Sequence, residues 1–324
     1  MISIALCTYN GEKYIKEQLE SIINQSLPPD EIIICDDCSK DNTEVEVKSV
    51  LENWKGSWKF IINEKNLGYK KNFEKAISLC KGDIIFLSDQ DDVWLSLKIK
   101  RTMDVFNENP DCVMAFHDAK VVNSHLEMLY PSFWKLLGFN PDKFLIGDYG
   151  ILLDHNVVQG SACAFRKSLF NISTPFPNEV IHDEWLTLNA LTLSKGIMPI
   201  NKCFSLYRQS DSNSIGARNL PINVKLKVWL KSYHKSLTNH YKEIIRRGKA
   251  FETLSYRYGA EDILLGERLD RYCKFYEFRK EALDSHNFLL VFMIKDYFRF
   301  YYSFSYSVKE YIEDILALAS HIEK

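Results

Sequence analysis

The chain lacks the sequence features that place a protein in or across a membrane. Its 324 residues include no uninterrupted apolar stretch of the roughly 20 residues that a transmembrane helix needs, so we expect no such helix. The apolar run at residues 2–7 is short and has no basic start, so we expect no signal peptide. The eight cysteines are scattered through segments predicted to be buried, a pattern typical of reduced thiols in a cytoplasmic protein.

Several motifs of common enzyme classes are also missing. There is no Gly-x-Gly-x-x-Gly or P-loop pattern, which disfavours a Rossmann dehydrogenase or an NTPase, and there is no Gly-x-Ser-x-Gly elbow. Cys35 and Cys38 form one C-x-x-C, but a zinc site needs two more ligands at matching spacing, so we interpret the pair as a coincidence. The net charge of −2 gives no reason to expect a nucleic-acid partner.

The residues that are present predict an α/β fold. Hydrophobic residues make up 46% and charged residues 26%, an ordinary balance for a globular protein. Short β-branched runs alternate with apolar residues at helical spacing, which indicates a mostly parallel central sheet with flanking helices. The expected strands are residues 1–7, 31–35, 58–62, 83–87, 112–122, 157–165 and 203–208.

The pattern changes in the last third of the chain. From about residue 220 the sequence pattern is typical of helices alone, and it follows a Ser-, Asn- and Gly-rich run at residues 210–216. We therefore expect two domains, an α/β domain over residues 1–218 and a helical region over residues 219–324.

Three of the expected strands end in polar clusters, at residues 8–11, 36–39 and 88–92. Ligands bind beyond the carboxyl ends of parallel strands, so these clusters form the candidate site. Asp89, Asp91 and Asp92 repel one another unless a cation or hydrogen-bond donors neutralise them, and Mg²⁺ and Mn²⁺ prefer such ligands. The alternative is a solvated acidic turn, or the N-cap of the following helix.

The cluster at Asp36 and Asp37 allows two interpretations. A carboxylate at a strand end can accept hydrogen bonds from a base or from ribose hydroxyls, as dinucleotide-binding folds illustrate. Alternatively, Ser39 and Asp41 belong to a turn that caps the following helix. Asp41 and Glu44 would then form a capping box. Both interpretations can hold together.

Seven short motifs follow one another along the first two thirds of the chain. They are T-Y-N-G at 8–11, D-D-x-S-x-D at 36–41, N-x-G-x-x-K-N-F at 66–73, S-D-Q-D-D-V-W at 88–94, G-S at 160–161, H-D-E-W at 182–185 and Y-R-Q-x-x-x-N-x-x-G-A at 207–217. Together they resemble the inverting glycosyltransferase family two, and the last resembles a signature of bacterial rhamnosyltransferases. The resemblance implies a GT-A-type catalytic domain over residues 1–218.

The resemblance also implies the donor side of the site. Asp89 and Asp91, with Asp92 beside them, would hold Mn²⁺ or Mg²⁺ against the diphosphate of a dTDP- or UDP-sugar. Lys71 or Arg208 would add a positive contact to the phosphates. The residues implied to bind the donor are Thr8, Tyr9, Asn10, Asp37, Asn66, Lys71, Asp89 and Arg208.

On the acceptor side, the resemblance implies that Asp183 is the general base. Glu184 is the alternative base, and because successive helix side chains point about 100° apart, only one of the two would face the site. Relatives often carry a His directly after Y-R-Q, where this chain has Ser210, so either the metal shell is completed differently or this position matters less than in those relatives. The residues implied to bind the acceptor are Gly160, Ser161, Glu184 and Trp185.

The implied activity is that of a metal-dependent, inverting hexosyltransferase. It would move a sugar, rhamnose by the last motif, to a hydroxyl of a glycan or lipid-linked glycan in bacterial surface polysaccharide synthesis. A nucleotidyltransferase also grips metal and phosphates with paired Asp residues, and a non-catalytic nucleotide-sugar-binding protein is a further alternative. The presence of Asp89, Asp91 and Asp183 together argues against the non-catalytic alternative, since a pure binder needs no base.

The helical region suggests two further partners. Eight basic residues and one acidic residue lie between 225 and 249, and an aromatic stretch follows at 287–308. Such a pattern suits peripheral docking on the anionic inner face of the cell membrane. The alternative is a helical bundle whose aromatic residues form its own core or a homodimer interface.

Overall fold

The computed structural model describes residues 1–145, 152, 156–178, 180–191, 193, 196–209, 242, 245–246, 249, 274 and 276–285. The chain divides into two compact units, Met1–Gly216 and Ala217–Lys324. Residues 210–217 of the last motif, most of the basic stretch and the whole aromatic stretch lie outside the described residues. Among the helices that are described, none combines the length and the apolar character needed to cross a bilayer.

In the second unit, residues 276–284 are helical, and Lys249 forms an ion pair with Glu277 at 2.8 Å between Nζ and Oε1. These described residues do not test membrane docking or a dimer interface, and both stay predictions.

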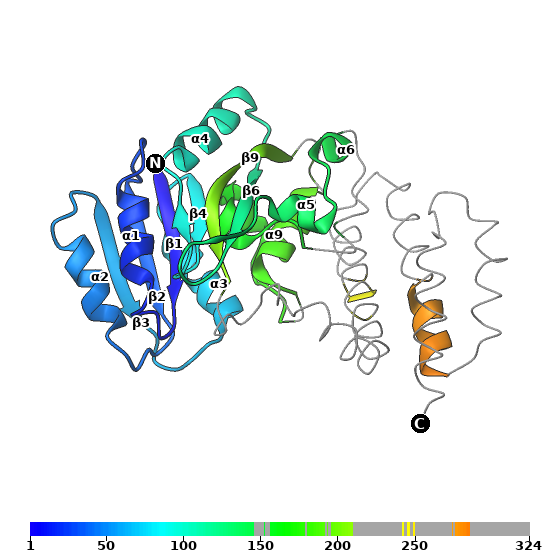
Figure 1. Ribbon diagram of the computed structural model, residues 1–324, viewed down its shortest axis with the longest axis horizontal. Helices are drawn as coiled ribbons and strands as arrows, with labels where there is room; N and C mark the ends of the chain where they lie inside the picture. The colour runs from blue at the N-terminus through cyan, green and yellow to red at the C-terminus, as the bar shows by residue number, and fades with distance from the viewer. Residues whose placement is uncertain are drawn as a thin grey trace. The chain divides into compact units, whose positions relative to one another are not determined.

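The first unit is built on one mixed sheet, whose amino-terminal part is parallel (Figure 1). Buried β-branched runs such as residues 31–35 suit strands that are covered on both faces, and the core contains their Ile and Leu side chains. The parallel strands lie in the order β3-β2-β1-β4. Their bounds are Ile2–Thr8 for β1, Glu31–Asp36 for β2, Ser57–Ile62 for β3 and Ile84–Ser88 for β4.

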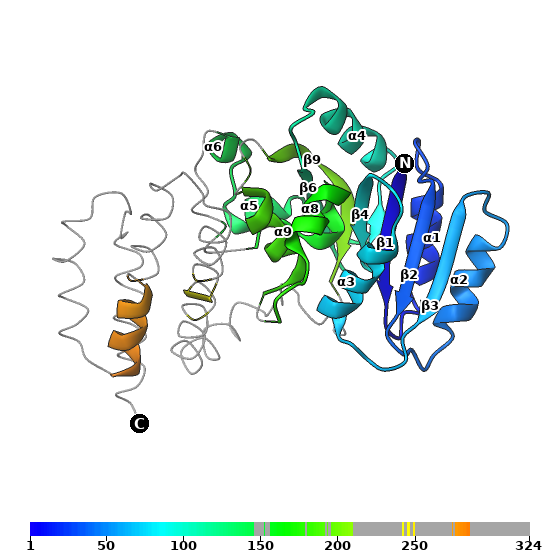
Figure 2. The same ribbon diagram turned by 180° about the vertical axis from the view of Figure 1, so that it is seen from behind.

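Helices cover both faces of this sheet (Figures 1 and 2). α1 and α2 pack against each other on one face, whereas α3 packs on β1 and β2 and contacts α9 on the other. Their bounds are Ile15–Ile23 for α1, Thr43–Leu51 for α2, Tyr69–Leu79 for α3, Lys98–Glu108 for α4, Phe133–Leu137 for α5, Pro141–Leu145 for α6, Lys167–Ser173 for α8 and His182–Leu191 for α9.

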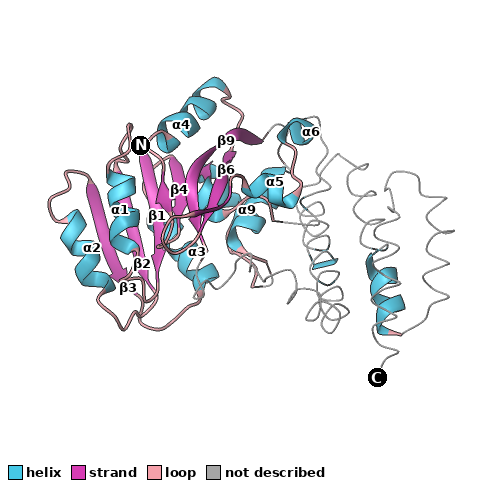
Figure 3. Ribbon diagram, viewed as in Figure 1, coloured by secondary structure: helices cyan, strands magenta, loops and turns pink. Residues whose placement is uncertain are grey.

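The sheet continues beyond β4 with strands of mixed direction, in the order β4-β8-β6-β9-β5 (Figure 3). β8 runs antiparallel to both β4 and β6, β9 runs parallel to β6, and β5 runs antiparallel to β9. β7 pairs with the end of β6. The bounds are Val93–Trp94 for β5, Met114–Val122 for β6, Met128–Tyr130 for β7, Cys163–Arg166 for β8 and Ile197–Arg208 for β9.

The predicted α/β fold is confirmed, but two local predictions are wrong. Residues 160–162 of the expected strand at 157–165 form a 3₁₀ turn, η1 (Gly160–Ala162), and β8 begins only at Cys163. The expected capping box does not form either: α2 starts after Asn42, whose backbone N–H donates to Glu12 Oε2 at 2.9 Å. A carboxylate from another loop thus takes the position expected for Glu44, which instead pairs with Lys48.

Candidate active site

The structure brings the three predicted strand-end clusters together. β2, β1 and β4 are parallel neighbours, so their carboxyl ends lie at one edge of the sheet. Gln90 joins the first and third clusters, since its Oε1 accepts from Tyr9 N at 2.8 Å and its Nε2 donates to Tyr9 O at 3.1 Å. Asn10 N donates to Ser39 Oγ at 2.8 Å, which joins the first cluster to the second. The loops after these strands therefore form one connected edge.

Gly11 permits this close approach. A Cβ atom at this position would lie 2.4 Å from Gln90 Oε1, so a side chain here would displace Gln90. Tyr9 is 51% exposed, whereas Thr8 is buried and donates from Oγ1 to Asp36 Oδ1 at 2.7 Å. Of the predicted donor residues in this cluster, Tyr9 thus presents its side chain to solvent.

Asp37 is bound by the loop that follows β3. Its carboxylate accepts hydrogen bonds from Leu67 N at 2.7 Å, from Gly68 N at 2.8 Å and from Asn63 Nδ2 at 2.8 Å. Asn66 donates from Nδ2 to Asp37 O at 3.2 Å, so both predicted donor residues hold this loop in place. Cys38 has a left-handed φ of 69° and donates from Sγ to Asn63 O, while Cys35 is buried in β2.

The Asp-rich turn after β4 concentrates negative charge. Burial raises the pKa of Asp89 well above its usual value, and the charges of Asp92, Asp91 and Asp183 raise it further. Burial, followed by the charge of Asp92, raises the pKa of Asp91 to about 7. Asp92 is 1% exposed, and burial raises its pKa too, against the lowering effect of Ser161, the Arg208 N–H and the charges of Lys98 and Arg208. Nearby positive charges therefore do not fully compensate the negative charge of these carboxylates.

Lys98 is a buried cation behind this turn that the sequence analysis missed. Its Nζ donates to Ser161 O and lies 3.4 Å from the centroid of the Trp94 ring. Burial lowers the pKa of Lys98 to about 7, while the charges of Asp92, Cys163 and Asp89 raise it. The signal was the spacing in α4, where Lys98 belongs to the same buried stripe as Ile99, Thr102 and Phe106.

Asp183 lies in the first turn of α9 and is held in place by three donors. Its Oδ2 accepts from Gly160 N at 2.8 Å, and its Oδ1 accepts from Asn156 Nδ2 at 3.0 Å and from Glu184 N at 2.7 Å. Burial, followed by the charge of Glu184, raises its pKa to about 7. A Cβ atom on Gly160 would lie 2.9 Å from His182 Nε2, which explains the glycine. Asn156 has no sequence signal that marks it.

The remaining acceptor-side predictions receive less support from the geometry. Trp185 is buried and donates from Nε1 to Ser173 O at 2.6 Å, so its indole packs against α8. Ser161 and Glu184 are buried as well. His182 stacks on Phe73 with ring centroids 4.1 Å apart, and burial lowers its pKa to about 3, which makes it a neutral packing residue between α3 and α9.

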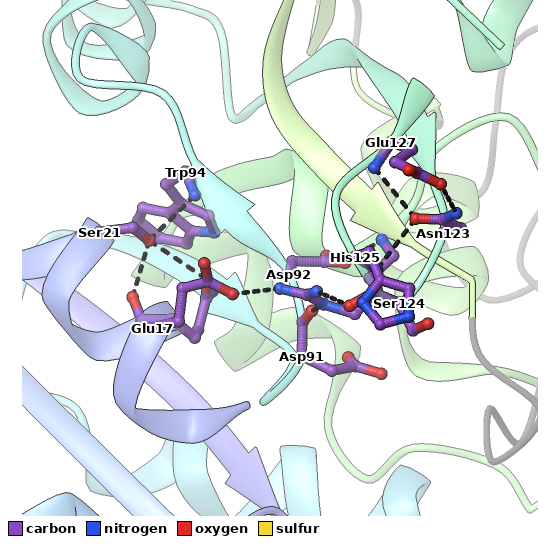
Figure 4. Close-up of polar contacts among 11 residues, drawn as sticks. Glu17, Ser21, Asp91, Asp92, Trp94, Asn123, Ser124, His125 and Glu127 are labelled. Carbon is purple, nitrogen blue, oxygen red and sulfur yellow. Dashed lines mark hydrogen bonds and ion pairs between the residues drawn. The ribbon is translucent and has the colours of Figure 1, made fainter. Parts of the chain in front are cut away.

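The two cations expected at the donor phosphates have protein partners instead. Lys71 Nζ donates to Phe176 O at 2.6 Å and to Glu74 Oε2 at 2.7 Å, which places it against the segment that precedes α9. Arg208 is 2% exposed, and its guanidinium donates to Asp91 O, Ser124 O and Glu17. These three partners are labelled in Figure 4. A phosphate contact by either residue remains a prediction that this geometry does not support.

The described residues offer part of a metal site. No group of three or more His, Cys, Asp or Glu side chains among them is arranged to hold a metal ion. The raised pKa values of Asp89 and Asp91, and a buried Asp92 Oδ2 without a hydrogen-bond partner among the described residues, nevertheless indicate uncompensated negative charge. This arrangement fits a hard cation that takes one or two carboxylates from the protein and its other ligands from phosphates and water.

Comparisons with known proteins identify the family. Residues 3–172 match the sequence model of Glycosyl transferase family 2. Over 250 residues the chain is 32% identical to the dTDP-rhamnosyl transferase RfbG of Shigella flexneri, a match that covers 72% of this chain and 82% of that protein.

Two solved structures share the fold at low sequence identity. TarS 1–349 of S. aureus in complex with UDP-GlcNAc is 18% identical, with a TM-score of 0.57, over 99% of this chain and 80% of that one. The mannosyltransferase PcManGT from Pyrobaculum calidifontis in complex with GDP-Man and Mn²⁺ is 16% identical, with a TM-score of 0.50, over 99% of this chain and 86% of that one. The motifs, the fold and the match over half of the chain agree, and the protein belongs to glycosyl transferase family 2.

Proposed function

We propose that this glycosyltransferase inverts the configuration of the sugar that it transfers, with Asp183 as the general base. The observation that carries the proposal is the state of Asp183: a buried carboxylate, fixed by three donors, with a pKa raised to about 7. A base with a pKa near the working pH combines a large ionised fraction with useful basicity. Its charge also contributes to the raised pKa of Asp89, which supports a single site that contains both the base and the Asp-rich turn.

The chemistry follows from the lone pairs of Asp183. A carboxylate offers about four acceptor positions, and the described donors occupy one on Oδ2 and two on Oδ1. The remaining position on Oδ2 would take the proton of the acceptor hydroxyl. As that oxygen forms its bond to the anomeric carbon, the bond from this carbon to the diphosphate breaks on the opposite face, and the electron pair leaves with the diphosphate. A single displacement of this kind inverts the anomeric centre.

Asp89 and Asp91 would hold a divalent cation, Mn²⁺ or Mg²⁺, which supplies positive charge to the leaving diphosphate. Both are half-buried, whereas Asp92 faces inward and its Oδ1 accepts from Arg208 N at 3.1 Å. We therefore assign Oδ1 of Asp92 to the support of the turn, while its buried Oδ2, which has no hydrogen-bond partner among the described residues, adds negative charge near the cation. PcManGT was solved with GDP-Man and Mn²⁺, which supports a cation for this fold.

We further propose dTDP-rhamnose as the donor, on the strength of the similarity to RfbG. The exposed ring of Tyr9 would stack on the base of the nucleotide. The acceptor would be a hydroxyl of a glycan or lipid-linked glycan in bacterial surface polysaccharide synthesis. The reaction would take place on the cytoplasmic side, at the inner face of the membrane, and the described cysteines are all free thiols, which suits that compartment. Membership in a glycosyltransferase family removes the basis for the nucleotidyltransferase alternative.

A thermal-shift panel tests the donor and the cation together. The panel contains dTDP-rhamnose, UDP-glucose, UDP-galactose and GDP-mannose, each with and without Mn²⁺. Because a ligand that binds only the folded state raises Tm, we expect dTDP-rhamnose with Mn²⁺ to give the largest shift. Asp91→Asn should remove the Mn²⁺-dependent part of that shift. The matched control is Asp104→Asn in α4, whose side chain is 39% exposed. Equal shifts with and without Mn²⁺ would refute the metal assignment.

A further inference from the structure

Arg208, at the end of β9, connects the Asp-rich turn to two other elements. β5 pairs antiparallel with β9, with Val93 opposite Leu206, and this register places Arg208 opposite Asp91. Its Nε donates to Asp91 O at 2.7 Å, and its Nη1 donates to Ser124 O at 2.7 Å in the turn between β6 and β7. Figure 4 shows Glu17 and Ser124 on opposite sides of the Asp91–Asp92 turn.

The third nitrogen of the guanidinium, Nη2, contacts α1. Nη2 of Arg208 forms an ion pair with Glu17 Oε2, and the guanidinium carbon lies 4.4 Å from the centroid of the Tyr14 ring. Arg208 is buried, whereas the Glu17 side chain is 48% exposed. A planar guanidinium suits this arrangement because its donors point in fixed, separate directions, which a lysine cannot reproduce.

The backbone of Arg208 contributes as well. Its N–H donates to Asp92 Oδ1 at 3.1 Å, and its charge favours the ionised forms of Asp91 and Asp92. One residue therefore contacts a carbonyl and a carboxylate of the turn and adds a positive charge to it. Nε, Nη1 and Nη2 each donate to the protein and the residue is 2% exposed, so the guanidinium presents little surface to a donor diphosphate.

We propose that Arg208 is a positioning residue: it holds the Asp-rich turn in place from behind, with Glu17 as its anchor on α1, and does not bind the donor diphosphate. The expected effect on metal and donor binding rests on the proposed function. The contacts by which Arg208 and Glu17 hold the turn, which we call the clamp, do not. Glu17 then acts on the site from a distance, although it lies on a helix that carries none of the proposed metal ligands.

The two roles predict opposite effects for Glu17→Gln. In the clamp, loss of the Glu17 charge loosens the turn and weakens Mn²⁺-dependent dTDP binding by about twofold to fivefold, the range expected for a half-exposed ion pair. If Arg208 instead binds the diphosphate, loss of its competitor frees the guanidinium and strengthens dTDP binding. Arg208→Lys should weaken binding by about tenfold or more, since the lysine keeps the charge and loses the fork. Glu20→Gln on the same helix is the matched control.

Hydrogen exchange of the backbone at residues 88–94 provides a readout that does not depend on activity. The full chain is measured as wild type, Glu17→Gln, Arg208→Lys and Glu20→Gln, without ligand and with dTDP and Mn²⁺. We expect this segment to exchange faster in Glu17→Gln and Arg208→Lys than in the wild type, and at the wild-type rate in the control Glu20→Gln. Unchanged exchange together with stronger dTDP binding by Glu17→Gln would overturn the clamp. If the wild type binds neither dTDP nor Mn²⁺, the proposed function fails. The exchange of residues 88–94 would still show whether Arg208 holds the turn in place.

Discussion

The carboxylates at the two ends of the site differ in their hydrogen-bond partners and in the charges near them. Asp36, the last residue of β2, accepts hydrogen bonds from the end of β1 and from the loop after β2, and Asp37 accepts from the loop after β3. Asp89 and Asp183, beyond β4, lie near other carboxylates, and burial raises their pKa values. Asp183 accepts from as many N–H donors as Asp37, so such donors alone do not mark a carboxylate that only holds the fold. Burial together with a neighbouring carboxylate charge is what marks Asp89 and Asp183 as candidates to bind a cation or a proton.

The largest expected effect is on Asp183. Asp183→Asn should lower kcat for rhamnose transfer by about 10²-fold or more, the usual scale for a lost general base, and should leave dTDP-rhamnose binding unchanged. The measurement is steady-state transfer together with donor affinity. Glu184→Gln is the matched control and should stay active. If Glu184→Gln is the inactive variant and Asp183→Asn retains activity, the base is the neighbouring residue.

Asp37→Asn tests the other side of the comparison. The amide keeps one acceptor oxygen and turns an NH₂ group toward backbone N–H donors, so we expect a loss of about 2 kcal/mol of unfolding free energy. Urea denaturation measures this loss. The resemblance to the family implies instead that Asp37 binds the base or ribose of the donor. A variant of normal stability that no longer binds dTDP would support that role and break the comparison.

The parts of the molecule that sequence patterns predicted are those whose signals are local. The strand ends at Thr8, Asp36 and Ser88 follow from an apolar run and the polar residues directly after it. The partners of Lys71 and Arg208 could not be predicted in this way, because Phe176 O and Glu17 are brought to them by the folded chain over 105 and 191 residues. The sequence shows that a motif contains a lysine or arginine and therefore a positive charge. Which acceptor binds that charge depends on the tertiary structure.

The acid limb of the activity profile should reveal the environment of Asp183. A base works only when ionised, and because its pKa is raised to about 7, kcat/KM should fall as the pH drops below that value. Burial is the larger cause and the Glu184 charge the second, so Glu184→Gln should move the limb to lower pH by less than about one unit. The profile is recorded at saturating Mn²⁺. A limb that moves to higher pH, or stays in place, would show that the Glu184 charge does not act on the base.

The smallest effect is expected at Cys38, one residue after Asp37. Its φ of 69° lies in the left-handed region, which costs a residue with a Cβ about 1–2 kcal/mol, whereas glycine adopts it freely. Cys38→Gly removes this cost but loses the hydrogen bond to Asn63 O and gains entropy in the unfolded chain, so unfolding free energy should change by less than about 1 kcal/mol. Cys38→Ala loses the same hydrogen bond and keeps the backbone cost, so it should be the less stable of the two variants in urea denaturation. Transfer activity should be unchanged in both, because the thiol is bound to the loop after β3. An alanine variant that matches glycine would mean that the turn relaxes to another backbone conformation, and loop geometry on this side would then be less rigid than its hydrogen bonds indicate.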